Sequence, residues 1–474
     1  MNAAGGCAPR VSGMTALAAV ADWLDEHLDG LLTEYGVPGA VVAADLGGEV
    51  VVRPAGVLST RSGVPVTADS LFQIGSITKV WTATLVMQLV EEGKLDLDTP
   101  IREYLPEFGL ADPAAAAAVT ARQLLSHTAG FEGDVFTDTG RGDDCLQKYV
   151  ETLHTDPQLF PPGEQFSYNN AGYCVLGRLV EVLRGDPFDA CLSRRLFGPL
   201  GLEHAAASPY EAILHQVAVG HLPGENGAAP SPAPVWALAR SNSPAGSVLA
   251  MRAADLLSFA RMHRRAGQAD SGQRLLAPEM VSAMQRRQVE VPELAMMGQA
   301  WGLGWELYRF GESEVFGHDG GTIGQAAFLR VVPARDLGLV LLTNGGDVIG
   351  LYRRVIGHLL SELAGLQLPP DPVPAPQSPP VGADRFVGEY ACEVVRYQLS
   401  QDEAGRLWLA EIPQGVLAEL AGRPPERVEL LPYSDSTLIS AEAQRGSHQL
   451  FAFLGDDGQG RARYLHTGRI VQRV

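Results

Sequence analysis

The sequence predicts an α+β fold followed by a small antiparallel β domain. Two observations carry the first part: β-rich runs occur near the N-terminus and again after residue 300, and a long helix-rich section lies between them. A third observation predicts the second part. A proline-rich segment is followed by short alternating runs with many turn residues, which is typical of a barrel or sandwich.

The individual elements follow from hydrophobic periodicity and turn residues. Residues 16–35 have an amphipathic helical pattern, and residues 40–46 and 49–54 read as a hairpin joined by two glycines. Further helices are expected at residues 76–92, 121–126, 145–153, 171–184, 188–196 and 253–266. Strands are expected at residues 302–308, 314–317, 326–332 and 337–343, with part of a closing helix at 358–365.

The clearest domain boundary is the segment LPPDPVPAPQSPP at residues 368–380, where seven of thirteen residues are proline. Such a segment cannot pack as a helix or a central strand, so it acts as a stiff spacer. We therefore expect four parts: a flexible N-terminus (1–15), a main domain (16–366), a Pro-rich linker (367–383) and a β domain (384–474).

The composition excludes several functional classes. Hydrophobic residues make up 46% and charged residues 19%, an ordinary globular balance. No apolar run approaches the roughly 18–20 residues of a membrane span, and a net charge of −19 argues against nucleic acid or a membrane as partner. The five cysteines include no Cys-x-x-Cys pair, so neither a zinc site nor a disulfide framework is indicated. We expect no metal and no cofactor. The N-terminal residues lack the pattern of a secretory signal, which predicts a cytoplasmic protein.

The first candidate motif is Ser76-Ile77-Thr78-Lys79, at the start of the helix expected over residues 76–92. Residues three apart share one face of a helix, so the Lys79 amine is expected close to the Ser76 hydroxyl. A buried lysine has a lowered pKa, and its neutral form accepts a serine proton. Alone the motif is weak, because a helix-capping serine followed by a solvated lysine has the same pattern.

The second motif is Tyr168-Asn169-Asn170. A tyrosine hydroxyl beside an ammonium group loses its proton more easily, so Tyr168 is a candidate general base toward Ser76 and then a general acid toward the leaving group. The Asn170 amide is a candidate for holding a substrate carbonyl. The alternative is an ordinary turn after the preceding Pro-Pro-Gly.

The third motif is His318-Asp319-Gly320-Gly321. Glycines at a strand let a substrate backbone approach closely. The backbone N–H of Gly321 is a candidate oxyanion donor together with that of Ser76, and His318 is a candidate for polarising the site or binding a substrate carboxylate. A second His-x-Gly, His466 to Gly468, lies in the terminal β domain without flanking glycines, and we interpret it as structural.

In their joint order, these motifs resemble the penicillin-binding-protein and class C β-lactamase family of serine enzymes. The resemblance covers about residues 16–366 and includes FQIGSITKVWTATLVMQLVEEGKLDLDTPIREYLPEF, LLSHTAGF, PPGEQFSYNNAGYCVLGRLVE, PLGLEHA, PAGSVLAMRAADLLSFAR and FGHDGGTIG. It implies a β-lactamase-like fold, with an antiparallel sheet flanked by helices and a helical lobe. The terminal β domain is similar to the lipocalin-like appendage of some family peptidases and thioesterases, which implies a small antiparallel barrel.

The resemblance also implies roles for the motif residues. Ser76 is the acyl-enzyme nucleophile, Lys79 and Tyr168 carry protons, Asn170 orients substrate, and residues 318–321 line the strand edge of the site. The third motif departs from the Lys-Thr-Gly form typical of β-lactamases. His-x-Gly is the form of related esterases, D-aminopeptidases and peptide cyclases, which argues against a β-lactamase. His127, within LLSHTAGF, is expected to bond nearby backbone.

We therefore expect a serine enzyme that transfers an acyl group of a peptide or ester substrate through Ser76. The narrower hypothesis is a penicillin-binding-protein-type thioesterase that releases and cyclises a nonribosomal peptide, with a carrier protein as candidate partner. The alternatives are a D-stereospecific peptidase or a carboxylesterase, and then a β-lactamase or a non-catalytic peptide-binding relative. Residues 228–246 are either a loop at the substrate cleft or a plain surface loop. Substrate identity, stereochemistry and oligomeric state stay open.

Overall fold

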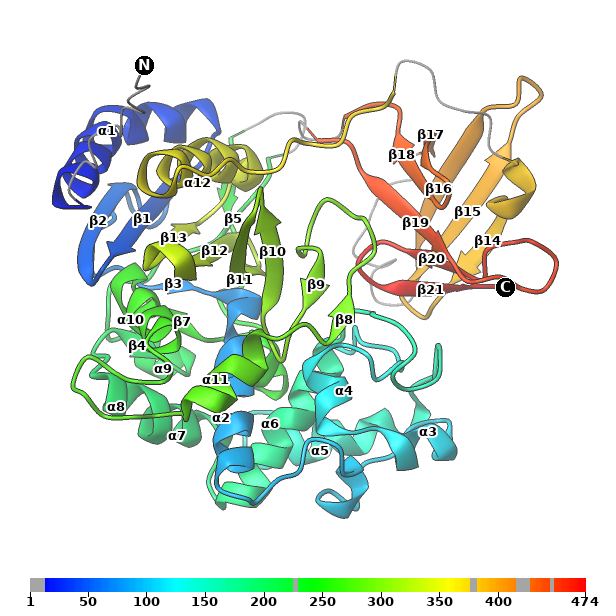
Figure 1. Ribbon diagram of the computed structural model, residues 1–474, viewed down its shortest axis with the longest axis horizontal. Helices are drawn as coiled ribbons and strands as arrows, with labels where there is room; N and C mark the ends of the chain where they lie inside the picture. The colour runs from blue at the N-terminus through cyan, green and yellow to red at the C-terminus, as the bar shows by residue number, and fades with distance from the viewer. Residues whose placement is uncertain (1–12, 225–228, 376–381, 415–426, 444–446) are drawn as a thin grey trace, which may run out of the picture.

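The computed structural model describes residues 13–224, 229–375, 382–414, 427–443 and 447–474, and Figure 1 shows that they form two parts. Residues 1–12 of the expected N-terminal segment 1–15 lie outside the described residues. The rest of that segment belongs to the helix α1 (Gly13–Glu34). The expected linker 367–383 lies outside the described residues between 376 and 381.

The first part contains an eight-stranded antiparallel sheet with the order β2-β1-β13-β12-β11-β10-β9-β8. The expected N-terminal hairpin forms its edge. Its first strand also pairs with β13, where Ala40 lies opposite Thr343. The strands are β1 (Gly39–Leu46), β2 (Glu49–Gly56), β8 (Val289–Glu290), β9 (Ala300–Trp301), β10 (Glu306–Phe310), β11 (Ser313–Thr322), β12 (Gln325–Val332) and β13 (Leu337–Thr343).

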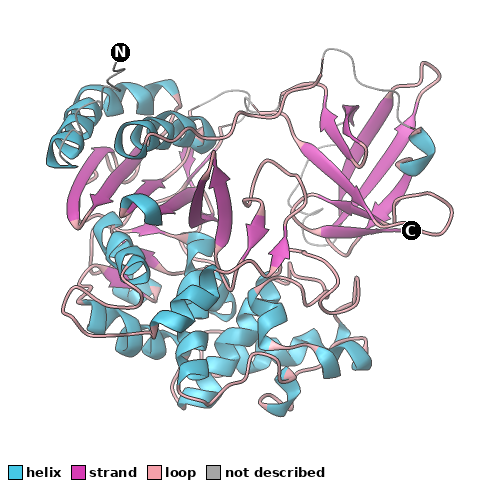
Figure 2. Cartoon of the chain, viewed as in Figure 1, coloured by secondary structure: helices cyan, strands magenta, loops and turns pink. Residues whose placement is uncertain are grey.

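Helices cover both faces of this sheet (Figures 1 and 2). Side chains of a strand alternate between its two faces: Ala40 and Val42 of β1 pack with α1 and α12 (Val348–Ala364), while Val41 and Ala43 face the other core. That other core includes α10 (Ala253–Arg264) and the helical lobe. The closing helix expected at 358–365 begins ten residues earlier, where the Asp347 side chain caps it.

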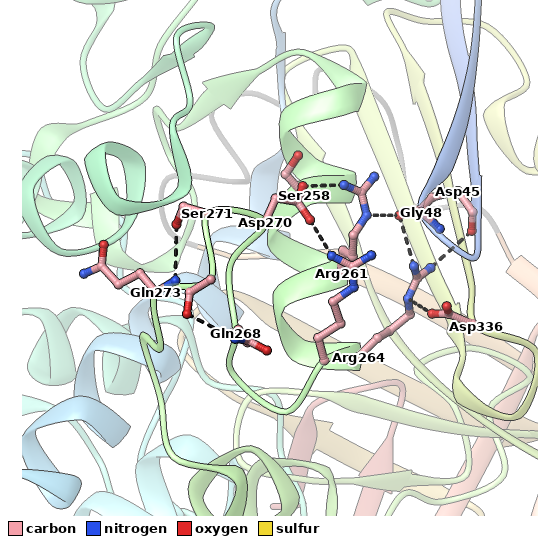
Figure 3. Close-up of polar contacts among 12 residues, drawn as sticks. Asp45, Gly48, Ser258, Arg261, Arg264, Gln268, Asp270, Ser271, Gln273 and Asp336 are labelled. Atoms are coloured by element: carbon pink, nitrogen blue, oxygen red, sulfur yellow. Dashed lines mark hydrogen bonds and ion pairs between the residues drawn. The ribbon is translucent and has the colours of Figure 1, made fainter.

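A buried ion-pair network joins α10 to the end of β1 (Figure 3). Asp45 is fully buried, and its Oδ2 lies 2.6 Å from Arg261 Nε and 3.0 Å from Arg264 Nη2. Arg264 also pairs with Asp336 at 3.0 Å. A buried carboxylate needs such partners because an unpaired charge in the interior is costly. The network therefore fixes the helix against the sheet without contacting the motif residues.

The helical lobe surrounds α2 (Thr78–Glu91), whose residues from Thr78 to Leu89 are all buried. The sequence pattern indicated only one apolar face, but neighbouring helices pack around α2 on all sides, as expected for a helix inside a core. The other helices are α3 (Pro113–Ala118), α4 (Ala121–Leu125), α5 (Cys145–Thr152), α6 (Asn170–Arg184), α7 (Phe188–Leu192), α8 (Gly198–Leu200), α9 (Pro209–Ala212) and α11 (Pro278–Gln285). Short strands complete this part: β3 (Phe72–Gln73), β4 (Ala205–Ala206), β5 (His221–Leu222), β6 (Ser231–Pro232) and β7 (Ala250–Met251).

The C-terminal part is a closed antiparallel barrel of eight strands, which confirms the expected small β-barrel. Its own core is filled by inward-facing side chains such as Tyr390, Leu409 and Phe453. The strands are β14 (Gly388–Ala391), β15 (Val395–Gln401), β16 (Leu407–Pro413), β17 (Arg427–Ser434), β18 (Thr437–Ser440), β19 (Leu450–Leu454), β20 (Tyr464–His466) and β21 (Ile470–Arg473). Across the described residues, no helix has the length and apolar character that crossing a membrane requires.

Candidate active site

Ser76 lies at the junction between a short strand and the central helix. β3 leads into a 3₁₀ turn (Gly75–Ile77), and α2 begins only at Thr78, so Ser76 sits just before the α-helix that was expected to include it. The Lys79 Nζ still lies 3.0 Å from Ser76 Oγ. Ser76 is half-buried whereas Lys79 is fully buried, so the hydroxyl is the member of the pair that an acyl group can reach.

The Lys79 amine is held in a dry environment. Its Nζ donates a hydrogen bond to the Ala245 carbonyl at 2.6 Å and lies 4.8 Å from the centre of the Tyr168 ring. Burial lowers the pKa of Lys79 to about 7, with the neighbouring Cys174 opposing the shift. Near neutral pH a large fraction of the amine is therefore uncharged, and the uncharged form is able to accept the Ser76 proton.

Tyr168 lies in the loop that precedes α6 and is 5% exposed. Burial raises its pKa above the ordinary value of 10.0, although a hydrogen bond with Ser76 favours the ionised form. The expected loss of the phenol proton beside the ammonium group is therefore not found, because desolvation of the phenolate outweighs the nearby charges. This arrangement favours Lys79 as the proton acceptor and the protonated Tyr168 as the donor toward a leaving group.

His127 supports the tyrosine from one side. Its backbone has a φ of 58°, and its Nδ1 accepts a hydrogen bond from the Asn169 N–H at 2.9 Å. The ring stacks on that of Tyr168 with centroids 4.4 Å apart. Burial holds the pKa of His127 well below its usual value, so the ring is uncharged. The expected bond to nearby backbone is present, and it belongs to the segment that carries Tyr168.

His318 is 1% exposed and lies behind the tyrosine, with ring centroids 6.5 Å apart. Its Nδ1 lies 2.6 Å from the Asp319 carbonyl oxygen, which can only accept, so Nδ1 carries the proton. The buried Glu306 carboxylate lies 3.4 Å from the same nitrogen. Burial lowers the pKa of His318 to about 3, so the ring is neutral and supplies no charge for a substrate carboxylate. Its Nε2 has no hydrogen-bond partner among the described residues.

The two glycines after His318 bring β11 against the nucleophile. A Cβ on Gly320 would lie 1.9 Å from the Ile74 carbonyl oxygen, so no other residue fits between these backbones. A Cβ on Gly75 would lie 2.6 Å from the Gly321 nitrogen, which places that peptide beside the Ser76 turn. Gly321 itself is exposed and its own Cβ position is open. Its N–H and that of Ser76 stay the predicted oxyanion donors.

Asn170 begins α6, and its amide already has a partner, because Nδ2 donates to Asp134 Oδ1 at 2.8 Å. The other oxygen of Asp134 pairs with Arg469, a residue of the C-terminal barrel. The Arg469 guanidinium lies 5.1 Å from the centre of the Tyr168 ring. The site therefore includes a cation from the second domain, which no sequence motif indicated.

Glu306, Asp134 and Arg469 are the charged residues of the site that no motif indicated. Arg469 lies 301 residues from Tyr168 in the chain, and only the nearby His-x-Gly at 466–468 marked that region. Within residues 228–246, the C-terminal end reaches the site: the Ala245 carbonyl binds Lys79, and Gly246 packs on the Gly75 backbone. Residue 228 of that loop lies outside the described residues. The described residues contain no group of His, Cys, Asp and Glu arranged to hold a metal.

Comparisons with known proteins found a matching family model, a similar relative and solved structures of similar fold. The family model described as Beta-lactamase matches residues 24–355. Penicillin-binding protein 4 of Amycolatopsis lactamdurans is 45% identical over 376 residues, covering 79% of this chain and 98% of that protein. The solved structure of SurE has a TM-score of 0.78 at 29% identity and covers 97% of this chain and 100% of that one. SurE solved with D-Leu has a TM-score of 0.76 at 29% identity and covers 96% and 100%.

Proposed function

This chain belongs to the β-lactamase family and is a serine hydrolase or acyltransferase, and from that premise we propose that it is a peptide thioesterase that cyclises its product. The proposed substrate is a peptide thioester or ester whose C-terminal residue has the D configuration. The proposed product is a macrocycle, formed when the amine at the other end of the same peptide attacks the acyl-enzyme.

One observation carries this proposal: the combination of a β-lactamase-like domain with a barrel that contributes to the site. The likeness to SurE extends over 97% of the chain and must therefore include most of the barrel. A solved structure of SurE holds D-Leu, which supports a D-configured residue as the acyl donor here. The barrel places Arg469 beside Tyr168 and Asp134. We therefore expect a long substrate to contact both domains.

The acylation step uses the contacts described above. Ser76 Oγ attacks the thioester carbonyl while its proton passes to the neutral Lys79 amine 3.0 Å away. The negative oxygen of the intermediate is stabilised by the N–H groups of Ser76 and Gly321. When the carbon–sulfur bond breaks, the thiolate takes a proton from Tyr168, and Tyr168 regains it from Lys79. The result is an ester on Ser76 and a free thiol.

The release step reverses the proton path. A peptide amine attacks the ester carbonyl and gives a proton to Tyr168, which passes its own phenol proton to Lys79. Lys79 then donates a proton to Ser76 Oγ as the ester bond breaks. Attack by water in place of the amine gives a linear acid. The two groups that carry the proton, Lys79 and Tyr168, are buried, and this setting supports attack by an amine that a folded peptide brings to the site.

A D-stereospecific peptidase that is acylated by penicillin is the second candidate. It is favoured by the 45% identity to penicillin-binding protein 4. The two candidates share the acylation step and differ in the leaving group and in the attacking nucleophile.

A linear peptide thioester with a D-residue at its C-terminus separates the candidates. We expect a cyclic product whose mass is that of the thioester substrate minus that of the released thiol, identified by mass spectrometry, and no product from the Ser76→Ala variant. A substrate with an L-residue at the same position is the matched control and is expected to react at least tenfold more slowly. Exclusive formation of linear acid contradicts cyclisation, and a stable penicilloyl adduct on Ser76 would favour the second candidate.

A further inference from the structure

The barrel holds the backbone of the segment that carries the catalytic tyrosine. The turn between β20 and β21 contacts residues 166–168 through three hydrogen bonds. His466 Nε2 bonds the Phe166 carbonyl at 2.8 Å, the Tyr168 N–H donates to the Gly468 carbonyl at 3.0 Å, and the Ile470 N–H donates to Ser167 Oγ at 3.1 Å.

The hydrogen bonds of His466 fix its tautomer. The Phe166 carbonyl can only accept, so Nε2 carries the proton, and Nδ1 accepts the Gly468 N–H at 3.0 Å. The side chain is fully buried, and burial lowers its pKa to about 4, so it stays neutral at working pH. Both ring nitrogens are therefore used, one on the main domain and one on the turn that reaches Tyr168.

Gly468 is suited to this contact. Its φ is 99°, which disfavours residues with a side chain. A Cβ at this position would lie 3.1 Å from the Met297 Cε, at the edge of the same contact. The glycine lets the turn expose its carbonyl to the Tyr168 N–H.

The segment is held from both sides by a histidine. On the inner side the His127 carbonyl accepts the Ser167 N–H at 2.8 Å, and His127 Nδ1 accepts the Asn169 N–H. On the outer side His466 and its turn complete the clamp. Apolar packing supports it: Phe166, Tyr168 and Trp301 share a cluster with Ala452 of the barrel, and the barrel lies beside β8 and β9 (Figure 1).

We infer that His466 is a positioning residue for Tyr168, so that the C-terminal barrel is a working part of the catalytic centre and not an appendage. This inference rests on the proposed function, because it assigns His466 to the proton transfer performed by Tyr168. It also revises the interpretation of the second His-x-Gly as merely structural. A small displacement of a proton donor lowers the rate of the chemical step more than it weakens substrate binding.

The test is steady-state hydrolysis of p-nitrophenyl butyrate by the full chain. His466→Phe removes both side-chain hydrogen bonds, and we expect kcat to fall about 10- to 100-fold while KM changes less than threefold. His466→Gln keeps an N–H that can reach the Phe166 carbonyl, so it should recover most of the loss. The matched control is His448→Gln, because His448 bonds the Ser440 carbonyl within the same barrel. Its kcat should equal that of the wild type.

A second variant covers the case in which His466→Phe does not fold. Ser167→Ala removes only the acceptor of the Ile470 N–H, and we expect kcat to fall about threefold. A folded His466→Phe protein, or in its absence a Ser167→Ala protein, with wild-type kcat would overturn the inference. Wild-type protein that neither hydrolyses the ester nor binds a fluorophosphonate at Ser76 would instead contradict the proposed function itself.

Discussion

The two halves of the candidate site are positioned in different ways. Ser76 and Lys79 are three residues apart on one short segment, and the helical geometry of that segment brings their side chains to 3.0 Å. Tyr168 lies on a loop whose backbone is held by His127 on one side and by the Gly468 turn on the other. The first half depends on a local structure, and the second depends on the docking of two domains.

This difference has a functional consequence. The reactivity of Ser76 is set by a helix buried inside one domain, which gives the nucleophile a stable environment. The second domain helps to hold Tyr168 in position and supplies the positively charged Arg469. Changes in the barrel are therefore expected to tune the rate and the substrate preference without removing the nucleophile.

The largest effect is expected from the local half. Lys79→Met replaces the amine with an apolar side chain of similar length and removes the base toward Ser76, so kcat/KM should fall about 10³-fold or more. The pKa of Lys79 is lowered by burial, and the unfolded chain binds this proton up to a higher pH. Wild-type stability therefore rises with pH from about 7 toward the ordinary lysine pKa of 10.5, whereas the Lys79→Met variant lacks this dependence.

Ester hydrolysis and thermal unfolding measure these two effects separately. Lys148→Met is the matched control, because the Lys148 side chain is 54% exposed and pairs with Asp144. A Lys79→Met protein with more than a tenth of wild-type activity would show that Tyr168 or His318 is the base.

A smaller effect is expected from the barrel half. In the wild type, kcat/KM should fall about tenfold per pH unit below about pH 7, because protonated Lys79 cannot accept a proton. Burial is the main cause of this low pKa and the Arg469 charge lowers it further, while Asp134 and Glu306 raise it. Arg469→Gln should therefore move the acidic limb to higher pH, and Asp134→Asn should move it to lower pH. At pH 7 we expect a several-fold loss in Arg469→Gln.

The pH–rate profile of p-nitrophenyl ester hydrolysis checks these shifts. Arg461→Gln serves as control, because Arg461 pairs with Asp457 on the exposed side of the same barrel. If the acidic limbs of the Arg469→Gln and Arg461→Gln pH–rate profiles coincide, the Arg469 charge does not affect the pKa of Lys79.

The smallest effect on activity is expected from the Asp45 network (Figure 3). Asp45→Asn removes the buried carboxylate that Arg261 and Arg264 share and leaves them only their half-exposed partners Asp270 and Asp336, so the free energy of unfolding should fall, by at most about 3–5 kcal/mol. Because this network does not contact the motif residues, kcat should stay within twofold of wild type well below the unfolding temperature. Urea unfolding and ester hydrolysis test the two parts of this prediction, and a parallel loss of kcat would argue that any loosening of the main domain disturbs the site.

The parts that the sequence predicted correctly are those with local signals. The N-terminal hairpin, the strands 326–332 and 337–343, and most helices followed from periodicity and turn residues. The strand expected at 302–308 was wrong in its position: the chain turns at Gly304, with a φ of 90°, between β9 and β10. Apolar content alone did not reveal this turn, because the residues around it are buried on both sides.

The sequence by itself predicted the pairing of Ser76 with Lys79 and a small terminal β domain, because these depend on short-range spacing and on composition, and its resemblance to a known family implied the β-lactamase-like fold and the barrel. Only the tertiary structure decided that Glu306, Asp134 and Arg469 join the site. It also decided that burial keeps the phenol of Tyr168 protonated and that His466 bonds the backbone of the segment that carries this tyrosine. Contacts between residues hundreds of positions apart, and the loss of water around them, arise from packing and leave no periodic signal in the chain.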